Sequence, residues 1–183
     1  EHRRARQIGR VFQDPMKGTA PHLTIEENLA LAARRGKRRT LRIGITKAER
    51  EQYRELLKSL DLGLENRLTA RVGLLSGGQR QALTLLMATV VTPKLLLLDE
   101  HTAALDPKSS ETVMRITDKL VKEKQVTSLM VTHNLRFALE YGSRLVMMHE
   151  GRCVLDVRGE EKQKLEIDAL LKVFNEISVE CGN

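Results

Sequence analysis

The sequence predicts an α/β protein with a largely parallel sheet and an all-helical subdomain inserted near the start of the chain. The continuous apolar run 95–98 is typical of a strand buried on both faces of a sheet, and residues 126–132 predict another buried strand. Helical patterns alternate with these runs after residue 76, and that order implies right-handed crossovers between parallel strands. Residues 16–75 carry helical patterns alone, which indicates a separate helical part.

Length and composition indicate one folded domain. The chain has 183 residues, of which 41% are hydrophobic, enough to bury a core. Its formal charge of +7 suits an anionic partner: a nucleotide, a nucleic acid or a membrane surface. Aromatic residues make up 3% and are scattered, which argues against a stacking surface for single-stranded nucleic acid. No apolar run reaches the length of about 20 residues that a bilayer-spanning helix needs.

Three elements are predicted in the first part of the chain. β-branched and aromatic residues predict a short strand that ends near Gln13. Thr24 and Glu27 form a capping box, which predicts the start of a helix. A second capping box at Thr46 opens another helix, and Gly63 is expected to close it.

The remaining elements follow from apolar periodicity and turn residues. They are expected in the order helix 79–91, strand 95–98, helix 108–124, strand 126–132, helix 134–141, strands 145–149 and 153–157, and helix 165–177. Glu150-Gly151-Arg152 predicts a hairpin turn between the last two strands. The two cysteines, Cys153 and Cys181, form no metal-type pair, which suits a reducing compartment. Cys153 is expected to be a small buried side chain.

Two adjacent carboxylates follow the apolar run 95–98. Asp99 and Glu100 stand where that strand ends, and ligands of parallel sheets bind beyond the carboxyl ends of the strands. One carboxylate there can hold Mg²⁺, and the other can polarise an attacking water molecule. The alternative is a strand whose last residues simply reach solvent.

A serine and two glycines precede the helix at 79–91. Ser76, Gly77 and Gly78 leave backbone N–H groups at a helix N-terminus, where an anion binds favourably. The alternative is a loop in which Ser76 only caps the helix.

A glutamine and a histidine end two of the predicted strands. Gln13 ends the first strand, and His133 ends the run 126–132, which places it at the same sheet edge as Glu100. Either residue alone is unremarkable, because such side chains are often merely structural or exposed.

The order and spacing of these motifs resemble the ATP-binding subunit of ABC transporters, which has a P-loop NTPase-like fold. The resemblance covers residues 7–158, most of the chain. It rests on five motifs in order: Gln13, Leu75-Ser76-Gly77-Gly78-Gln79, Leu95-Leu96-Leu97-Leu98-Asp99-Glu100, Ala104-Leu105-Asp106 and His133.

The resemblance implies a site that binds ATP and Mg²⁺ and hydrolyses ATP. It gives Asp99 the role of orienting Mg²⁺ and Glu100 that of the general base for the attacking water. His133 would contact the γ-phosphate and stabilise the charge on it. Gln13 would sense both the Mg²⁺ and the water and would link the site to the helical segment.

The resemblance also implies a dimer. Ser76, Gly77, Gly78 and Gln79 would bind the nucleotide held by the opposite subunit, and Asp106 would lie at the dimer seam. The partners implied are a second ATPase subunit, with a homodimer expected, a transmembrane permease and a solute-binding protein, and no nucleic acid. Such a subunit is cytoplasmic and peripheral on the inner face of the cell membrane.

Segments 11–16 and 99–107 are similar to bacterial importer ATPases of the amino-acid type. In that family the helical part docks the permease, here near residues 14–31. The basic run Lys37-Arg38-Arg39 has two interpretations: a solvated loop, or a contact with anionic lipid.

The sequence departs from the family pattern at two points. His101 stands where the family usually has proline, and is interpreted as a local variant of the loop. No Gly-x-x-x-x-Gly-Lys-Ser/Thr motif occurs, and the resemblance implies that this phosphate loop would precede Glu1. The chain is therefore expected to be an ABC ATPase domain without its N-terminal part and to be inactive alone. The expected parts are a core formed by 1–15 and 76–158, a helical subdomain at 16–75 and a helical tail at 159–183.

Two other functions remain open from the sequence. One is an ABC-type ATPase that acts on nucleic acid or ribosomes, which the charge of +7 would suit. The other is a non-catalytic fragment that only binds a partner.

Overall fold

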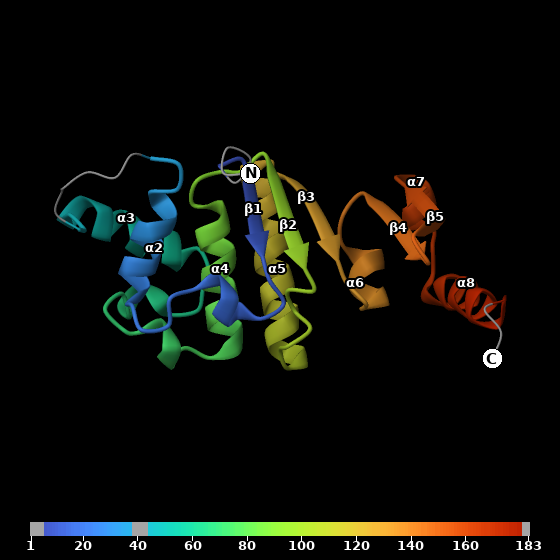
Figure 1. The fold of residues 1–183 in the computed structure, drawn as a ribbon, viewed down its shortest axis with the longest axis horizontal. Coiled ribbons are helices and arrows are strands. Elements are labelled where there is room, and N and C mark those ends of the chain that lie inside the picture. The colour runs from blue at the N-terminus through green and yellow to red at the C-terminus, as the bar shows by residue number, and fades with distance from the viewer. Residues whose placement is uncertain (1–5, 38–43, 181–183) are drawn as a thin grey trace. The chain divides into compact units, whose positions relative to one another are not determined.

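The computed structural model describes residues 6–37 and 44–180, and the chain divides into two compact units, Glu1–Val131 and Thr132–Asn183. The first unit contains β1 (Ile8–Val11), η1 (Pro15–Gly18), α2 (Ile25–Ala33), α3 (Lys47–Lys58), η2 (Leu64–Asn66), η3 (Val72–Leu74), α4 (Gly77–Thr89), β2 (Leu95–Asp99), α5 (Pro107–Lys124) and β3 (Thr127–Val131) (Figure 1). The second contains α6 (Leu135–Glu140), β4 (Arg144–His149), β5 (Arg152–Arg158), α7 (Glu160–Gln163) and α8 (Ile167–Glu180).

The first unit is built on a parallel sheet of β1, β2 and β3, with β2 in the centre. Ile8 lies opposite Leu95, and Asp99 lies opposite Val131. The predicted α/β architecture with a parallel sheet is confirmed for this part of the chain. Because the strands run in one direction, their carboxyl ends share one edge, and Asp99 stands at that edge.

One face of the sheet packs on α4 and α5 (Figure 1). Alternate residues of the strands, among them Val11, Leu96 and Leu98, point to this face and are almost fully buried. β1 approaches α4 closely, because a Cβ added to Gly9 would lie 2.8 Å from the carbonyl oxygen of Ala88. A larger residue at this position would push the strand away from the helix.

The prediction that 126–132 is a buried strand is wrong. β3 exists, but most of its residues are exposed, with Leu129 at 59% and Val131 at 53%. In the described part of the chain β3 pairs with β2 and forms an edge of the sheet. An apolar run predicts a strand, whereas its burial depends on what covers it.

Within the described residues of 16–75 the regular elements are helices: α2, α3 and the short turns η1, η2 and η3. Both capping boxes form: the Thr24 amide donates to Glu27 at 2.7 Å, and Thr46 makes the same arrangement at α3. α3 ends at Lys58, before Gly63, which instead precedes η2 as its N-cap with a φ of 69°. Most of the basic run predicted around Lys37 lies outside the described residues.

The helical part shares its core with the sheet. Leu29, Leu57 and Leu64 belong to the same buried cluster as Leu83 of α4 and Leu96 of β2. Two polar links support this packing. Glu26 of α2 accepts two hydrogen bonds from Arg50 of α3, at 2.6 and 2.9 Å, and the buried Asn28 exchanges hydrogen bonds with the backbone of Ala20. The first contact joins α2 to α3, and the second fixes the segment that follows β1 against α2.

The second unit contains the predicted hairpin. β4 and β5 pair antiparallel, and the turn between them places Glu150 and Gly151 at φ values of 45° and 76°. Cys153 is exposed, so the prediction of a buried side chain is wrong, because a two-stranded hairpin leaves much of its surface to solvent.

In the second unit, a buried lysine of α7 binds the carbonyl groups at the end of α6. Lys162 of α7 is 5% exposed and donates to the carbonyl oxygens of Leu139, Tyr141 and Gly142 at 2.6–3.0 Å. Burial lowers the pKa of this ammonium group. Because the carbonyls lie at the C-terminal end of α6, a cation there is favourable.

Across the described residues, none of the helices has both the length and the hydropathy that crossing a membrane requires.

Candidate functional site

The chain turns sharply where β2 ends. Glu100 follows Asp99 with a φ of 43°, an uncommon left-handed conformation for a residue with a side chain. Its amide donates to the carbonyl oxygen of Val131 at 3.0 Å, and its own carbonyl accepts from the Ala103 amide at 2.9 Å. The two predicted carboxylates therefore stand at the carboxyl edge of the sheet, on a turn held by the neighbouring strand and by the following loop.

Arg10 forms an ion pair with the first of these carboxylates. Its Nη2 donates to Asp99 Oδ2 at 3.0 Å, and both side chains are about half exposed. The guanidinium also lies over the ring of Phe12, 4.6 Å from its centroid. Sequence reasoning missed Arg10. The available signal was a charged residue in the middle of a β-rich segment, on the face of β1 opposite Val11.

Gln13 is exposed and lies just beyond β1, and residues of α4 contact the backbone of Phe12 before it and the side chain of Met16 after it. Gln81 of α4 is fully buried and donates from Nε2 to the carbonyl oxygen of Phe12 at 2.9 Å. Arg80 contacts the sulfur of Met16 at 2.8 Å and donates to three carbonyls of the loop before α4. The first turns of α4 therefore connect the segment around Gln13 to the loop that precedes Ser76.

The N-terminus of α4 has the predicted cap. Ser76 Oγ accepts from the Gln79 amide, and Gln79 Oε1 accepts from the Ser76 amide, both at 3.2 Å. The structural role of Ser76 is thus confirmed. The capping box uses these two amides and does not engage the first-turn amides of Gly77 and Gly78. The helix end consequently keeps the donors that an anion would need.

The two glycines pack closely on the start of α5. A Cβ added to Gly78 would lie 3.0 Å from Ser109, and one added to Gly77 would lie 3.2 Å from Leu105. Asp106 caps α5 by accepting from the Ser109 amide at 3.0 Å, and hydrogen bonds from Ser109 lower the pKa of its carboxyl. The structure therefore brings two predicted motifs together, and it gives the glycines a packing role besides any contact with a ligand.

His101 is buried between the end of β2 and α5. It is 1% exposed, and its Nε2 lies 3.1 Å from the Thr117 hydroxyl. That hydroxyl donates to the Val113 carbonyl at 2.8 Å, so it accepts from His101, whose proton is therefore on Nε2. The interpretation of His101 as a structural variant of the loop agrees with this placement.

Lowering the pH should destabilise the first unit through His101. Burial lowers the pKa of His101 from 6.5 to about 4. Between pH 6.5 and about 4, the imidazole is therefore protonated in the unfolded chain and neutral in the folded chain. The free energy of unfolding falls as the pH decreases through this range. We expect a loss of about 2 kcal/mol between pH 7 and pH 5, measured by urea denaturation. His101→Gln keeps a donor for Thr117 and does not titrate, so an equally steep pH dependence in that variant would contradict the assignment.

The predicted residues divide between the two units. Gln13, residues 76–79, Asp99, Glu100 and Asp106 lie in the first unit. His133 lies in the second unit, directly after Thr132, and is exposed.

The residues at the sheet edge fit a magnesium ion that arrives with a nucleotide. Nowhere in the described ranges do three or more His, Cys, Asp or Glu side chains gather as metal ligands. Mg²⁺ in nucleotide sites typically takes one or two carboxylates and completes its shell with phosphate oxygens and water. Asp99, with the exposed Gln13 beyond the neighbouring strand, fits that requirement.

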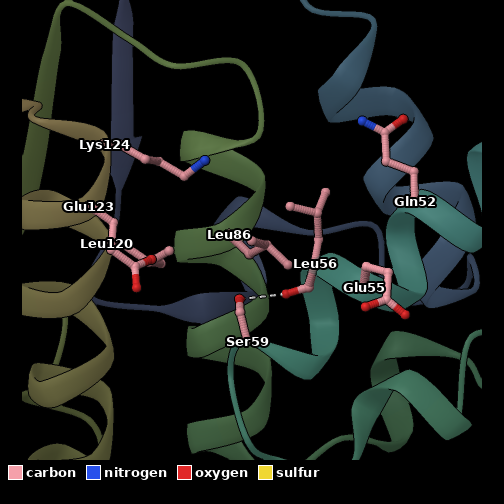
Figure 2. Close-up of a pocket in the computed structure, with 8 residues that line it drawn as sticks. All are labelled: Gln52, Glu55, Leu56, Ser59, Leu86, Leu120, Glu123 and Lys124. Atoms are coloured by element: carbon pink, nitrogen blue, oxygen red, sulfur yellow. Dashed lines mark hydrogen bonds between the residues drawn. The ribbon is translucent and has the colours of Figure 1, made fainter.

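A pocket of about 290 Å³ lies elsewhere in the first unit, between α3, α4 and α5 (Figure 2). Leu56, Leu86 and Leu120 line it together with polar side chains at its rim, and Ser59 donates to the Leu56 carbonyl at 2.7 Å. None of the predicted site residues lines this pocket, so it is separate from the sheet edge.

Comparison with known proteins agrees with the motif order. The family described as "ABC transporter" matches residues 1–103. The chain is 49% identical to the "Tyrosine transport ATP-binding protein" of Clostridioides difficile (strain R20291), over 95% of this chain and 69% of the relative. It is 40% identical to the "Sulfate/thiosulfate import ATP-binding protein CysA" of Halalkalibacterium halodurans, over 82% of this chain but only 41% of the relative.

A solved structure shares the fold. The dimeric, post-hydrolysis state of the ATP-binding cassette MJ0796 bound to ADP and Pi superimposes with a TM-score of 0.68 at 30% identity. The match covers 86% of this chain and 65% of the cassette, so this chain spans about two thirds of that protein's length.

Proposed function

Because this chain belongs to the ABC transporter family, we propose that it is the ATP-binding subunit of an ABC transporter. In this function a dimer hydrolyses ATP and drives solute transport through a separate membrane permease. One observation carries the proposal: Asp99 and Glu100 stand at the carboxyl end of the central strand, and α4 ties the segment around Gln13 to the turn at 76–79. The relatives whose names include "ATP-binding protein" support it.

The residues proposed for the site divide the chemistry of phosphoryl transfer. Mg²⁺ would neutralise charge on the phosphates of ATP, and Asp99 and Gln13 are the residues that would hold it. Glu100 accepts a proton from the attacking water, and His133 donates a hydrogen bond to the oxygen where negative charge develops. Such catalysis is mostly positioning and electrostatic stabilisation, so the hydrogen-bonded turn at Glu100 matters as much as its carboxylate.

The second half of each site comes from another copy of the chain. The amides of Gly77 and Gly78, at the N-terminus of α4, suit the phosphates of a nucleotide held by the partner. Ser76 and Gln79 fix that helix end. Asp106 caps α5 at Ser109, the residue on which Gly78 packs, and would lie at the seam between the copies. The dimeric state of the similar cassette supports this arrangement.

The names of the relatives support a proposal for the solute and the remaining partners. An amino acid is the proposed solute class, since the name of the tyrosine transport relative, at 49% identity, supports it. The permease would dock on the segment 14–31, which α4 connects to Gln13. In this proposal the subunit lies in the cytoplasm, against the inner face of the membrane, and a solute-binding protein would deliver the solute on the other side.

The direct test is ATP turnover by the protein at its natural length, followed as phosphate release with Mg²⁺. We expect turnover that Asp99→Asn removes, and no retention on duplex DNA at physiological salt. Absence of ATP binding in the natural-length protein would contradict the proposal. Salt-sensitive binding to DNA that stimulates turnover would favour a nucleic-acid ATPase instead.

A further inference from the structure

Arg10 lies at the proposed metal carboxylate but belongs to none of the family motifs. It projects from the face of β1 that carries Asp99 in the neighbouring strand, since Arg10 pairs in register with Leu97, two residues before Asp99. Its Nη2 donates to Asp99 Oδ2 at 3.0 Å. One oxygen of the carboxylate that would serve Mg²⁺ is therefore already engaged by a cation of the same chain.

A second contact keeps the guanidinium in this place. It lies 4.6 Å from the centroid of the Phe12 ring, and the Phe12 carbonyl accepts from the buried Gln81. Arg10 thus sits between the carboxylate and the residue that precedes Gln13. The ion pair itself is weak, because the Arg10 and Asp99 side chains are 53% and 48% exposed. A divalent ion can therefore displace it.

We propose that Arg10 is a positioning residue that competes with the divalent metal for Asp99 and so sets the metal affinity of the site. The inference rests on the proposed function, which gives Asp99 to Mg²⁺. A metal ion that uses Oδ2 must break the Arg10 hydrogen bond, and it is repelled by a guanidinium within a few ångströms. The same ion pair orients the Asp99 carboxylate when no metal is bound.

The experiment measures metal affinity rather than turnover. Mn²⁺ replaces Mg²⁺ as the probe, and free Mn²⁺ is counted by electron paramagnetic resonance. The natural-length protein is mixed with ADP below its own concentration, so that the nucleotide is bound. Arg10→Met removes the charge and keeps an apolar chain over Phe12, whereas Arg10→Lys keeps the charge. Lys94→Met is the matched control, because it removes one positive charge at the opposite end of β2.

Arg10→Met should bind Mn²⁺ about fivefold more tightly than the wild type, because one competing and repelling charge is gone. Arg10→Lys should stay within about twofold of the wild type, and Lys94→Met should not change the affinity. The gain in Arg10→Met should shrink as NaCl rises from about 0.05 to 0.5 M, because salt screens exposed charges. A merely structural role of Arg10 would produce neither the gain nor its salt dependence.

Asp99→Asn separates failure of this inference from failure of the proposed function. If Asp99→Asn weakens Mn²⁺ binding but Arg10→Met leaves it unchanged or weaker, the role of Arg10 is wrong and the metal role of Asp99 stands. If Asp99→Asn has no effect, the assignment of Asp99 to the metal is itself contradicted. If Arg10→Met gains affinity and Asp99→Asn in the same chain removes that gain, the competition for one carboxylate is supported.

Discussion

Glu100→Gln should slow ATP hydrolysis by at least about 100-fold while ATP binding is retained, which is the usual scale for loss of a positioned general base. The amide has the shape of the carboxylate but cannot accept the proton of the attacking water. The backbone of Glu100, with its φ of 43° and its hydrogen bonds to Val131 and Ala103, can accommodate either side chain. Single-turnover phosphate release and equilibrium binding of ATP measure the two effects separately.

One control variant and two possible outcomes define how Glu100→Gln is interpreted. Glu111→Gln removes a carboxylate from the exposed face of α5 and should hydrolyse ATP at the wild-type rate. Turnover close to normal in Glu100→Gln would exclude Glu100 as the base. Loss of ATP binding in the same variant would show instead that the turn after β2 has been damaged.

Gly78→Asp should abolish ATP-driven dimerisation and leave nucleotide binding by the single subunit almost intact. An aspartate at the N-terminus of α4 would place a negative charge against the phosphates that the amides of Gly77 and Gly78 are proposed to hold. Its Cβ would also meet Ser109 at 3.0 Å. Light scattering with and without ATP, in the Glu100→Gln background that prevents turnover, measures the effect on dimer mass.

The close contact with Ser109 requires a separate control. Crowding of a well-packed contact costs about 1–3 kcal/mol of stability, and Ser109→Gly removes the atoms that would be crowded. Gly78→Ala with Ser109→Gly should therefore dimerise, whereas Gly78→Asp with Ser109→Gly should not. If the aspartate variant regains dimerisation once Ser109 is trimmed, Gly78 matters for packing alone, and the proposed contact with the partner's nucleotide is wrong.

Elements that depend on neighbouring residues could be predicted from the sequence. The apolar run before Asp99 forms β2, and the capping boxes at Thr24, Thr46 and Ser76 all form. Each of these signals is local: a side chain bonds to an amide three residues away, or apolar residues follow one another in a short strand.

Contacts that depend on register and on neighbouring layers could not be predicted in this way. The ion pair of Arg10 with Asp99 exists because Arg10 lies opposite Leu97, and strand register between distant segments leaves no local pattern. The packing of Gly78 on Ser109 is equally remote in sequence. The exposure of β3 differs from the prediction for a related reason, because apolar composition does not reveal which layer lies over a strand.

The most direct test of a site shared between two copies is to mix two inactive variants. Glu100→Gln lacks the base but keeps the intact turn at 76–79, whereas Gly78→Asp keeps the base and carries the altered turn. A mixed dimer contains one site with both parts intact. The shared-site account predicts that the mixture hydrolyses ATP well above the sum of the two variants measured apart. Hydrolysis no greater than that sum, with mixed dimers shown to form, would contradict it.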